Sequence, residues 1–367
     1  MSSTGKNVLI YRLGSLGDTV MALPCFHKIR NTYPDANITV LTNKPVMAKA
    51  AALEAVLGVD FFYNNVMHYP VGTRDFRMLF SLIKQIRALK IDTVINLTAT
   101  RSKFSAKRDW LFFKAAGVRE LIGFKTPPVD IQLDNNTTGG PVKWEARRLA
   151  EQIETLGSIP LENDKYWDLK LTARERDVAD MILADIPATT PLLAIGNGTK
   201  ANVNDWGQAN WLQLVTGLKP LLPGWKLLIV GAADESKMAD SFLQAWGNEG
   251  LNLCGKTSPR VSAAILTRAM VYVGHDSGPM HLAACVGTPC VAIFSGRSLY
   301  GRWLPRGVHN KIIYHKTSCA GCGLEICIEE KKRCIMSVHV EEVREAVLSV
   351  IEDHFKEKNV ALHKITP

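Results

Sequence analysis

Short apolar segments alternate with longer amphipathic segments along most of the chain. The short segments predict buried strands, and the amphipathic segments between them predict helices. Strands are expected at residues 7–12, 37–41, 60–63, 93–97, 192–195, 226–230, 270–273, 291–294 and 311–314. Helices are expected at residues 19–33, 46–57, 74–89, 144–156, 209–221, 236–246, 262–269, 280–286 and 340–356. Alternation of this kind predicts parallel sheets covered by helices.

The alternation is interrupted between Pro127 and Asp168, where Pro-Pro, Asn-Asn and Gly-Gly pairs surround one amphipathic helix. A chain of 367 residues is long enough to form two cores. We therefore expect an α/β protein with two doubly wound domains, residues 1–175 and 176–340, which meet near residues 170–190. The last segment, residues 341–367, is a helix and a candidate to cross back to the first domain.

Composition and charge narrow the class of protein. Hydrophobic residues make up 47% of the chain and charged residues 22%, which is typical of a globular protein. No stretch of 18 uncharged apolar residues occurs, and the N-terminus lacks a signal-peptide pattern, so a cytoplasmic protein is expected. The net charge of +9 favours anionic partners. Because no helix-turn-helix or zinc-finger spacing is present, lipid headgroups are favoured over nucleic acid.

The first candidate site is a glycine-rich turn, Leu-Gly-Ser-Leu-Gly-Asp, at residues 13–18. Its two glycines let the backbone approach a ligand closely. Asp18 has two interpretations: a plain helix cap, or a carboxylate displayed at the carboxyl edge of the first strand, where open α/β sheets bind ligands. The spacing is not that of a dinucleotide-binding turn, and no P-loop lysine follows.

The second candidate site, residues 273–284, is the strongest anion site that the sequence predicts. A buried strand ends at Gly274, Asp276 and Ser277 are good helix caps, and Pro279 suits a first helical turn. The free amides at the start of the following helix attract phosphate or carboxylate. His281 can add a donor on the same side, although a buried histidine on an apolar helix is the plainer interpretation.

These segments carry a family resemblance. Arg-Leu-Gly-Ser-Leu-Gly-Asp at residues 12–18, followed by a proline-containing helix, resembles the opening of the bacterial lipopolysaccharide heptosyltransferases, the family-nine glycosyltransferases. Residues 275–284 are similar to that family's donor-binding signature of Asp, Thr or Ser, Gly, two residues and His. Residues 196–206 resemble its glycine-lysine-tryptophan segment, and residues 231–235 resemble a further donor contact. The four pieces occur in order from about residue 6 to about residue 350.

The resemblance implies a GT-B fold, in which two Rossmann-like domains face each other across a cleft. It also implies inverting transfer of a sugar, heptose from ADP-heptose, to lipopolysaccharide core at the inner membrane. Asp18 would be the general base. The donor would be held by Thr199, Lys200, Glu235, Asp276, Ser277, Gly278 and His281. One departure concerns a lysine that many members carry two residues before the tryptophan, because Asn204 occupies that place here and Lys200 would have to supply the charge.

The chemistry of the residues adds two expectations. The sequence contains no Asp-x-Asp, the arrangement that metal-dependent sugar transferases use, so catalysis without a cofactor is the hypothesis. The loop after the fourth strand contains four cations in eight residues, which suits an anionic acceptor. We expect Arg101, Lys103 and the backbone at Gly17 to contact that acceptor. The alternative for the cations is a solvated helix start.

Four late cysteines form the only candidate metal site in the sequence, at Cys319, Cys322, Cys327 and Cys334. Their spacing suits a structural zinc or iron ion, and nearby cations favour thiolates. Reduced thiols without a metal are the equal alternative. Two other functions remain open from the residues alone: a sugar-nucleotide epimerase or hydrolase of similar architecture, and a nucleotide-sugar-binding protein without turnover.

Overall fold

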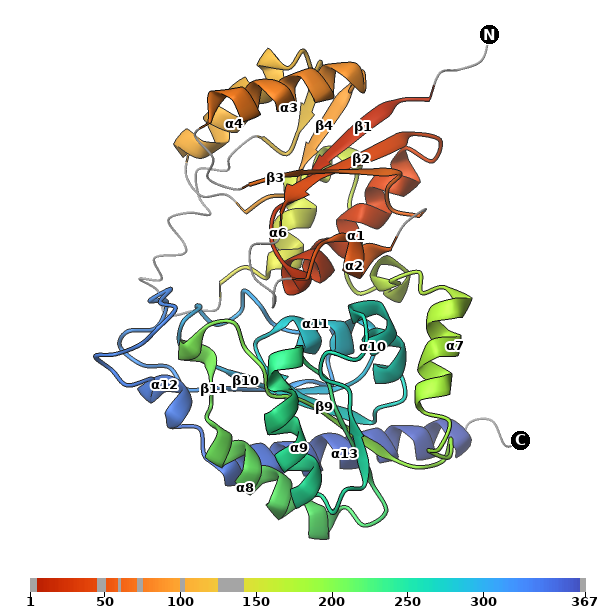
Figure 1. The fold of residues 1–367 in the computed structure, drawn as a ribbon, viewed down its shortest axis with the longest axis vertical. Helices are drawn as coiled ribbons and strands as arrows, with labels where there is room; N and C mark the ends of the chain where they lie inside the picture. The colour runs from red at the N-terminus through yellow and green to blue at the C-terminus, as the bar shows by residue number, and fades with distance from the viewer. Residues whose placement is uncertain are drawn as a thin grey trace. The chain divides into compact units, whose positions relative to one another are not determined.

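The computed structural model describes residues 5–44, 51–58, 61–70, 75–99, 103–124 and 142–363. The chain divides into two compact units, residues 1–170 and 171–367. Each unit is an α/β layer structure with one parallel sheet (Figure 1). None of the helices in these ranges is both long enough and apolar enough to cross a membrane.

The first unit contains a five-stranded sheet in the order β3-β2-β1-β4-β5, with every neighbouring pair parallel. The strands are β1 (Asn7–Tyr11), β2 (Asn37–Asn43), β3 (Asn65–Tyr69), β4 (Thr93–Asn96) and β5 (Glu120–Ile122). The helices are α1 (Leu16–Thr32), α2 (Glu54–Leu57), α3 (Phe76–Ala88), α4 (Lys103–Ala115) and α6 (Glu145–Gln152). Two short 3-10 helices follow at Glu154–Leu156 and Asp164–Trp167.

Helices pack against both faces of this first sheet. On one face, Leu82 and Ile86 of α3 and Phe113 of α4 join Leu9 and Val94 of the strands in one core cluster. Helix α1 is buried over most of its length and packs against α6. Apolar residues lie on all sides of α1, so its sequence does not have the one-sided pattern of a surface helix.

The second unit contains a six-stranded parallel sheet in the order β11-β10-β9-β6-β7-β8. Counted from β6, this is the 3-2-1-4-5-6 order of Rossmann folds. The strands are β6 (Leu192–Gly196), β7 (Lys226–Ile229), β8 (Gly250–Asn252), β9 (Val271–His275), β10 (Cys290–Phe294) and β11 (Lys311–Tyr314). The helices are α7 (Ala173–Ile182), α8 (Gln208–Leu218), α9 (Ser236–Ala245), α10 (Pro259–Leu266), α11 (Gly278–Cys285), α12 (Arg333–Met336) and α13 (Val340–His363). Three 3-10 helices lie at Asn202–Asn204, Lys219–Leu221 and Ala233–Glu235.

The final helix, α13, packs within the second unit. Val343, Val347 and Val350 belong to the same core cluster as Trp206 and Trp211. The indole nitrogen of Trp206 also donates a hydrogen bond to Val338 O, at 2.9 Å, just before this helix. The packing of α13 therefore gives no support to the expected crossing back to the first domain.

Three local predictions differ from the structure. Of the helix expected at residues 46–57, the described residues 51–57 are helical only at Glu54–Leu57, and residues 46–50 lie outside the described residues. Residues 61–63 are not a strand; the third strand is β3, at Asn65–Tyr69. Phe62 is buried because its ring packs edge-on against Phe26 and His27 of α1, not because it lies in a sheet. The prediction that a strand ends at Gly274 was also short by one residue, since β9 continues through the buried His275.

Candidate functional sites at the carboxyl edges of the two sheets

Each sheet has one topological switch point, where successive connections run in opposite directions from adjacent strands. These points lie between β1 and β4 in the first unit and between β6 and β9 in the second. Open α/β sheets bind ligands beyond the carboxyl ends of such strands. The residues that follow β1, β4, β6 and β9 are therefore the candidate site residues, and they include most of those singled out from the sequence.

Asp18 lies at the third position of α1, so it is not the N-cap, which is Ser15. Its Oδ2 accepts hydrogen bonds from the backbone N and the hydroxyl of Ser15, at 2.9 and 3.1 Å. Gly14 has a φ of +138°, and a Cβ there would lie 2.4 Å from Asp18 Cβ. The glycine turn is thus shaped around this carboxylate. The side chain of Asp18 is still 33% exposed, so the cap leaves it accessible.

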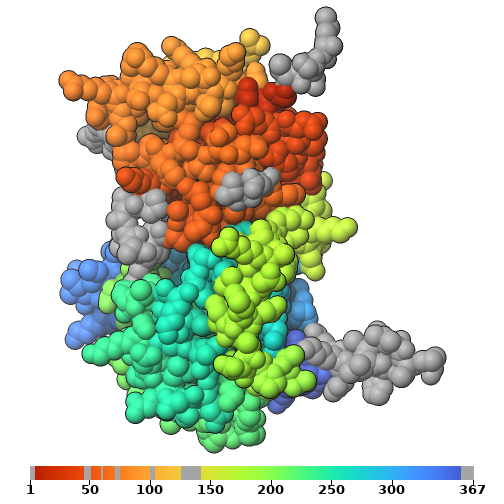
Figure 2. Space-filling view, turned by 45° about the vertical axis from the view of Figure 1, so that its right-hand side comes forward, coloured from red at the N-terminus to blue at the C-terminus, as the bar shows by residue number. Residues whose placement is uncertain are grey.

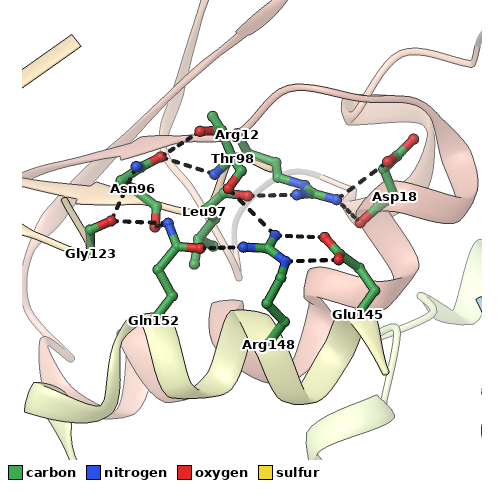
Figure 3. Close-up of polar contacts among 9 residues, drawn as sticks. All are labelled: Arg12, Asp18, Asn96, Leu97, Thr98, Gly123, Glu145, Arg148 and Gln152. Carbon is green, nitrogen blue, oxygen red and sulfur yellow. Dashed lines mark hydrogen bonds and ion pairs between the residues drawn. The ribbon is translucent and has the colours of Figure 1, made fainter. Parts of the chain in front are cut away.

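Arg12, which follows β1 directly, is a buried cation that holds the turn in place (Figure 3). Its guanidinium donates to Leu97 O at 2.5 Å and to the backbone carbonyl of Asp18. One of its nitrogens lies 3.8 Å from Asp18 Oδ1. Burial lowers the pKa of Arg12, and the negative charge of Asp18 opposes that shift. A charged residue at the end of an otherwise apolar strand was the sequence signal for this role.

Helix α6 contributes a second ion pair to the same edge (Figure 3). Arg148 donates to both carboxylate oxygens of Glu145, at 2.8 and 2.6 Å, and the Glu145 residue is only 2% exposed. Arg148 also donates to Gln152 Oε1 at 2.8 Å, and Gln152 in turn donates to Asn96 O at 2.8 Å. The network therefore ties α6 to the end of β4. The sequence interpretation assigned no role to these residues, since they lie far from β4 along the chain.

The start of the loop after β4, where the acceptor contacts were predicted, is fixed by Asn96 of the same network. Asn96 Oδ1 accepts from the backbone N and the hydroxyl of Thr98, at 3.0 and 2.8 Å. Of the predicted acceptor contacts, Gly17 is half-buried at the second position of α1. Lys103 is the first residue of α4, although its side chain lies outside the described residues, and Arg101 lies outside them entirely. The acceptor contacts of all three stay predictions.

In the second unit, two paired glycines make room for a buried tyrosine. Gly196 of β6 lies opposite Gly274 of β9. A Cβ at either position would lie 2.0 or 2.5 Å from the Tyr272 hydroxyl oxygen. Tyr272 is fully buried, and this burial raises the pKa of its hydroxyl well above the usual value. Glycine is therefore needed at this edge for packing as well as for access.

The start of α11 carries the predicted anion site. Ser277 is the N-cap residue by backbone geometry, yet its side chain makes no capping hydrogen bond. Gly278 begins the helix and is half-buried. His281 is 3% exposed, and its Nε2 lies 3.8 Å from Asp276 Oδ1. The structure thus brings together all four residues that the sequence placed here.

Buried polar atoms without a hydrogen-bond partner among the described residues gather at this edge. They are Asn197 Oδ1 and His281 Nδ1, together with the hydroxyls of Tyr272 and Ser277, which approach each other but make no hydrogen bond of good geometry to the described residues. Native proteins satisfy nearly all buried polar atoms, so a cluster of exceptions calls for an explanation such as a ligand. These atoms surround the switch point between β6 and β9, where the fold places ligands.

Glu235 reaches the same edge from the turn after β7. Its Oε2 accepts from the backbone N of Ala232 at 2.9 Å, so the carboxylate caps the start of this turn. The carboxylate also fills the space beside two glycines. A Cβ at Gly198 or Gly231 would lie 2.0 or 2.2 Å from one of its oxygens. Glu235 is therefore both a structural cap and a neighbour of the segment after β6.

The loop after β6 has polar residues but not the family lysine. The Thr199 hydroxyl donates to Ala201 O at 3.3 Å, and Lys200 is exposed. Asn204 Oδ1 accepts from the hydroxyl of Ser295. Next to it, Asp205 O accepts a hydrogen bond of 2.9 Å from the ammonium of Lys332. The fold therefore brings a distant lysine beside the place where the family lysine is missing, which sequence spacing could not reveal.

His275, the last residue of β9, is a buried neutral support for this loop. Its Nε2 lies 3.1 Å from the backbone N of Trp206, which donates to it. Burial lowers the pKa of His275 to about 4. The neutral ring can therefore accept this hydrogen bond at neutral pH, and it also contacts the Trp211 ring edge-on.

The four late cysteines do not form the predicted metal site. Within the described ranges, which include all four, no three Cys, His, Asp or Glu residues gather as metal ligands. Cys334 is buried, whereas Cys322 is exposed. Cys319 Sγ lies 3.3 Å from the Thr317 hydroxyl, and Cys327 Sγ accepts from the backbone N of Lys332 at 3.4 Å. The thiols thus have separate surroundings, because the loop spreads them over different depths.

Comparisons with known proteins match most of the chain to one family. The sequence model of glycosyltransferase family 9 (heptosyltransferase) matches residues 79–333. A curated relative, lipopolysaccharide heptosyltransferase 3 of Escherichia coli K12, is 25% identical over 305 residues, covering 79% of this chain and 82% of the relative. Asp18 precedes the matched range of the family model.

Three solved structures share the fold. A family 9 glycosyltransferase from Veillonella parvula has a TM-score of 0.72 at 19% identity, covering 96% of this chain and 99% of that one. An ADP-heptose lipopolysaccharide heptosyltransferase II from E. coli has a TM-score of 0.62 at 15% identity, covering 95% and 99%. The iron-containing dodecameric glycosyltransferase TibC from enterotoxigenic E. coli has a TM-score of 0.54 at 14% identity, covering 95% and 77%.

Proposed function

Because this chain belongs to glycosyltransferase family 9 (heptosyltransferase), we propose that it transfers heptose from ADP-heptose to the core of lipopolysaccharide. One structural neighbour is an ADP-heptose heptosyltransferase, and the curated relative is a lipopolysaccharide heptosyltransferase. We propose inversion at the sugar and catalysis without a metal ion. The GT-B fold of this family is consistent with two sites, one for the donor and one for the acceptor.

One observation carries the donor site: the buried polar atoms without partners beside β6 and β9. We propose that Ser277 Oγ, the first amides of α11 and His281 bind the diphosphate. Helix N-termini bind phosphate because their amides are unpaired and the helix dipole is positive there. Negative charge builds up on the departing diphosphate in the transition state, so fixed donors there lower the barrier.

We propose that Glu235, Thr199 and Asp276 complete the donor site. Glu235 lies beside Gly198 and Gly231, so its carboxylate can accept from sugar hydroxyls of the nucleotide. Lys200 and Lys332 are the two lysines of the loop region that can approach a diphosphate. The sequence interpretation named only Lys200.

Asp18 is the proposed general base. Its Oδ2 is occupied by Ser15, whereas its Oδ1 has only the ion pair with Arg12, at 3.8 Å, within the part of the chain that the structure describes. The carboxylate is accessible, and Gly14 and Arg12 restrict its position. A positioned carboxylate that accepts the proton of an acceptor hydroxyl contributes to rate in this way. The hydroxyl oxygen then bonds to the anomeric carbon as the bond to the diphosphate breaks.

The decisive variant is Asp18→Asn, measured for transfer and for donor binding separately. We expect transfer to fall about 100- to 10,000-fold, because the general base is lost. Donor binding, followed by the thermal shift with ADP-heptose, should not change. A variant that still transfers at the wild-type rate would exclude Asp18 as the base.

Ser15→Ala is the matched control for the capping role of Asp18. It removes one hydrogen bond to the carboxylate and leaves the carboxylate itself. If both variants lose the same activity and the same stability, the effect of Asp18→Asn is structural. Product analysis by NMR tests inversion, and transfer that chelator abolishes and magnesium restores would refute metal independence.

The same assays separate the alternative functions. An epimerase or hydrolase would convert the nucleotide sugar without any acceptor present. A binding protein without turnover would show the thermal shift but no product. The family match favours transfer over both.

A further inference from the structure

Among the described residues of the first unit, exposed large apolar side chains occur on two helices only, α3 and α4. These helices are neighbours in the structure (Figure 1) and form part of the orange surface in Figure 2. We call their six exposed side chains the aromatic surface: Phe76, Met78, Phe80, Phe104, Trp110 and Leu111. Exposed large apolar side chains gathered on neighbouring helices are a candidate interaction site.

Helix α3 shows the feature most clearly, because its apolar stripe is wider than the part that the core covers. Leu82 and Ile86 are buried in the core against the sheet. Phe76 and Phe80, one turn apart, are 85% and 56% exposed. An ordinary surface helix has one apolar face toward the core and a polar face toward water. The exposed margin of the stripe on α3 is therefore available to a partner other than the core.

Cations accompany the exposed rings. The ammonium of Lys84 lies 4.9 Å from the centre of the Phe80 ring, and that of Lys114 lies 5.8 Å from the Trp110 ring. Residues 75–119 contain ten Lys or Arg and three Asp or Glu, so this segment carries most of the net charge of +9. The partner should therefore be anionic as well as apolar.

We propose that the aromatic surface docks this protein on an anionic lipid bilayer. Aromatic rings beside lysines and arginines are the composition of helices that lie in the membrane interface. The rings enter the headgroup region while the cations contact anionic headgroups. A bilayer accounts for both features, whereas an acidic protein would account for the charge alone.

The position of the surface fits the acceptor of the proposed function, and this part of the inference rests on that function. In a parallel sheet, the helix after a strand begins at the carboxyl edge. Phe76 begins α3 after β3, and Phe104 is the second residue of α4 after β4. Asp18 lies beyond the same edge, after β1. Docking would thus hold the candidate base near the membrane, where a lipid-anchored acceptor lies.

Vesicle co-sedimentation tests the proposal directly with the full-length chain. Vesicles of phosphatidylethanolamine with phosphatidylglycerol should bind the wild-type protein, and vesicles of phosphatidylcholine should not. The variant Phe76→Ser/Phe80→Ser should bind the anionic vesicles at least about tenfold more weakly than the wild type, because two interfacial rings are lost. Serine and phenylalanine have similar helix propensities, so α3 should remain folded, which circular dichroism checks.

A control variant replaces two similarly exposed apolar side chains of the second unit with serine. Val308 and Ile326 are 88% and 62% exposed, close to the values for Phe76 and Phe80. Val308→Ser/Ile326→Ser should therefore bind anionic vesicles as the wild type does. A second pair tests charge: Arg77→Glu/Lys84→Glu should abolish binding, and Lys256→Glu/Lys356→Glu should retain it.

Three results would overturn the proposal. They are equal binding to neutral and anionic vesicles, equal loss in the test and control variants, and a wild-type dimer in solution that Phe76→Ser/Phe80→Ser makes monomeric. The last would identify a second copy of the chain as the occupant.

Transfer to a soluble core oligosaccharide without lipid should persist in the phenylalanine variant. Failure of that transfer in the wild type would refute the proposed function without affecting vesicle binding.

Discussion

The two sheet edges use the same fold in different ways. In the first unit, most polar groups beyond β1 and β4 bind one another: Arg12 to Leu97 O, Arg148 to Glu145, and Gln152 to Asn96 O, although Arg12 Nε has no partner among the described residues. In the second unit, Asn197 and His281 beyond β6 and β9 have buried atoms without a partner among the described residues, and the hydroxyls of Tyr272 and Ser277 approach only each other there. The first edge is assembled before any ligand binds, and the second has groups that a ligand can satisfy.

This difference suits the two proposed roles. A general base must be held in one place, and the ion pairs of Arg12 with Asp18 and of Arg148 with Glu145 contribute to this. A site for a charged diphosphate needs donors that are not already used. Unsatisfied buried groups reduce the stability of the free protein, and that stability is recovered when a ligand binds to them.

The largest expected effect is the loss of one partner in the first network. Arg148→Met leaves Glu145 buried without its cation, so the free energy of unfolding should fall by about 3–5 kcal/mol. The double variant Glu145→Gln/Arg148→Met should recover much of that loss, because no buried charge remains unpaired. Urea denaturation measures both. If the single and double variants are equally unstable, packing rather than charge is responsible.

A pH effect should come next in size, from His275 in the second unit. Burial lowers its pKa from 6.5 to about 4 in the folded state, so the unfolded chain binds the proton first as pH falls. The stability that the neutral ring contributes is complete above pH 6.5. It should be lost progressively toward pH 4, by about 3 kcal/mol in total.

Urea denaturation at a series of pH values measures that loss, with His275→Gln as the comparison. The glutamine can still accept the hydrogen bond from Trp206 but does not titrate. His27 in the first unit is a second buried histidine with a pKa lowered by burial, so it contributes to the same pH dependence, and His275→Gln should remove only part of the loss. An unchanged pH profile in His275→Gln would contradict the assignment.

A smaller effect separates the two candidate lysines of the donor site. Loss of a charge-assisted hydrogen bond to phosphate should weaken donor binding by about 1.5–3 kcal/mol. If Lys332 replaces the missing family lysine, Lys332→Gln should show this loss and Lys200→Gln should show less. Calorimetric titration with ADP measures both. The opposite order would return the role to Lys200.

The smallest effect is expected at the hydroxyls of Ser277 and Tyr272. Ser277→Ala and Tyr272→Phe should leave the free energy of unfolding without ligand within about 1 kcal/mol of the wild type, since each variant loses only the contact between these two hydroxyls. Ser277→Ala should still weaken donor binding. A large loss of stability in the absence of ligand would mean that these groups have partners, and the contrast between the two edges would disappear.

Much of the fold was predictable because it depends on local pattern. The buried strands β1, β6 and β10 are continuous apolar segments, and the glycine turns after β1 and β9 mark where strands become helices. Short edge strands such as β5 and β8, with three residues each, have too little pattern to be recognised. Helices α4 and α7 were missed because charged residues interrupt their apolar positions.

The sequence by itself determined the alternation of strands and helices, the two glycine turns and the motifs of Asp18 and residues 276–281, because each is encoded within a few neighbouring residues. Only the tertiary structure decided which distant groups meet there. It brought Arg148 and Gln152 to the end of β4, placed Lys332 beside Asp205 and separated the four cysteines. Such contacts depend on the order of strands and the packing of helices, and chain spacing does not record either.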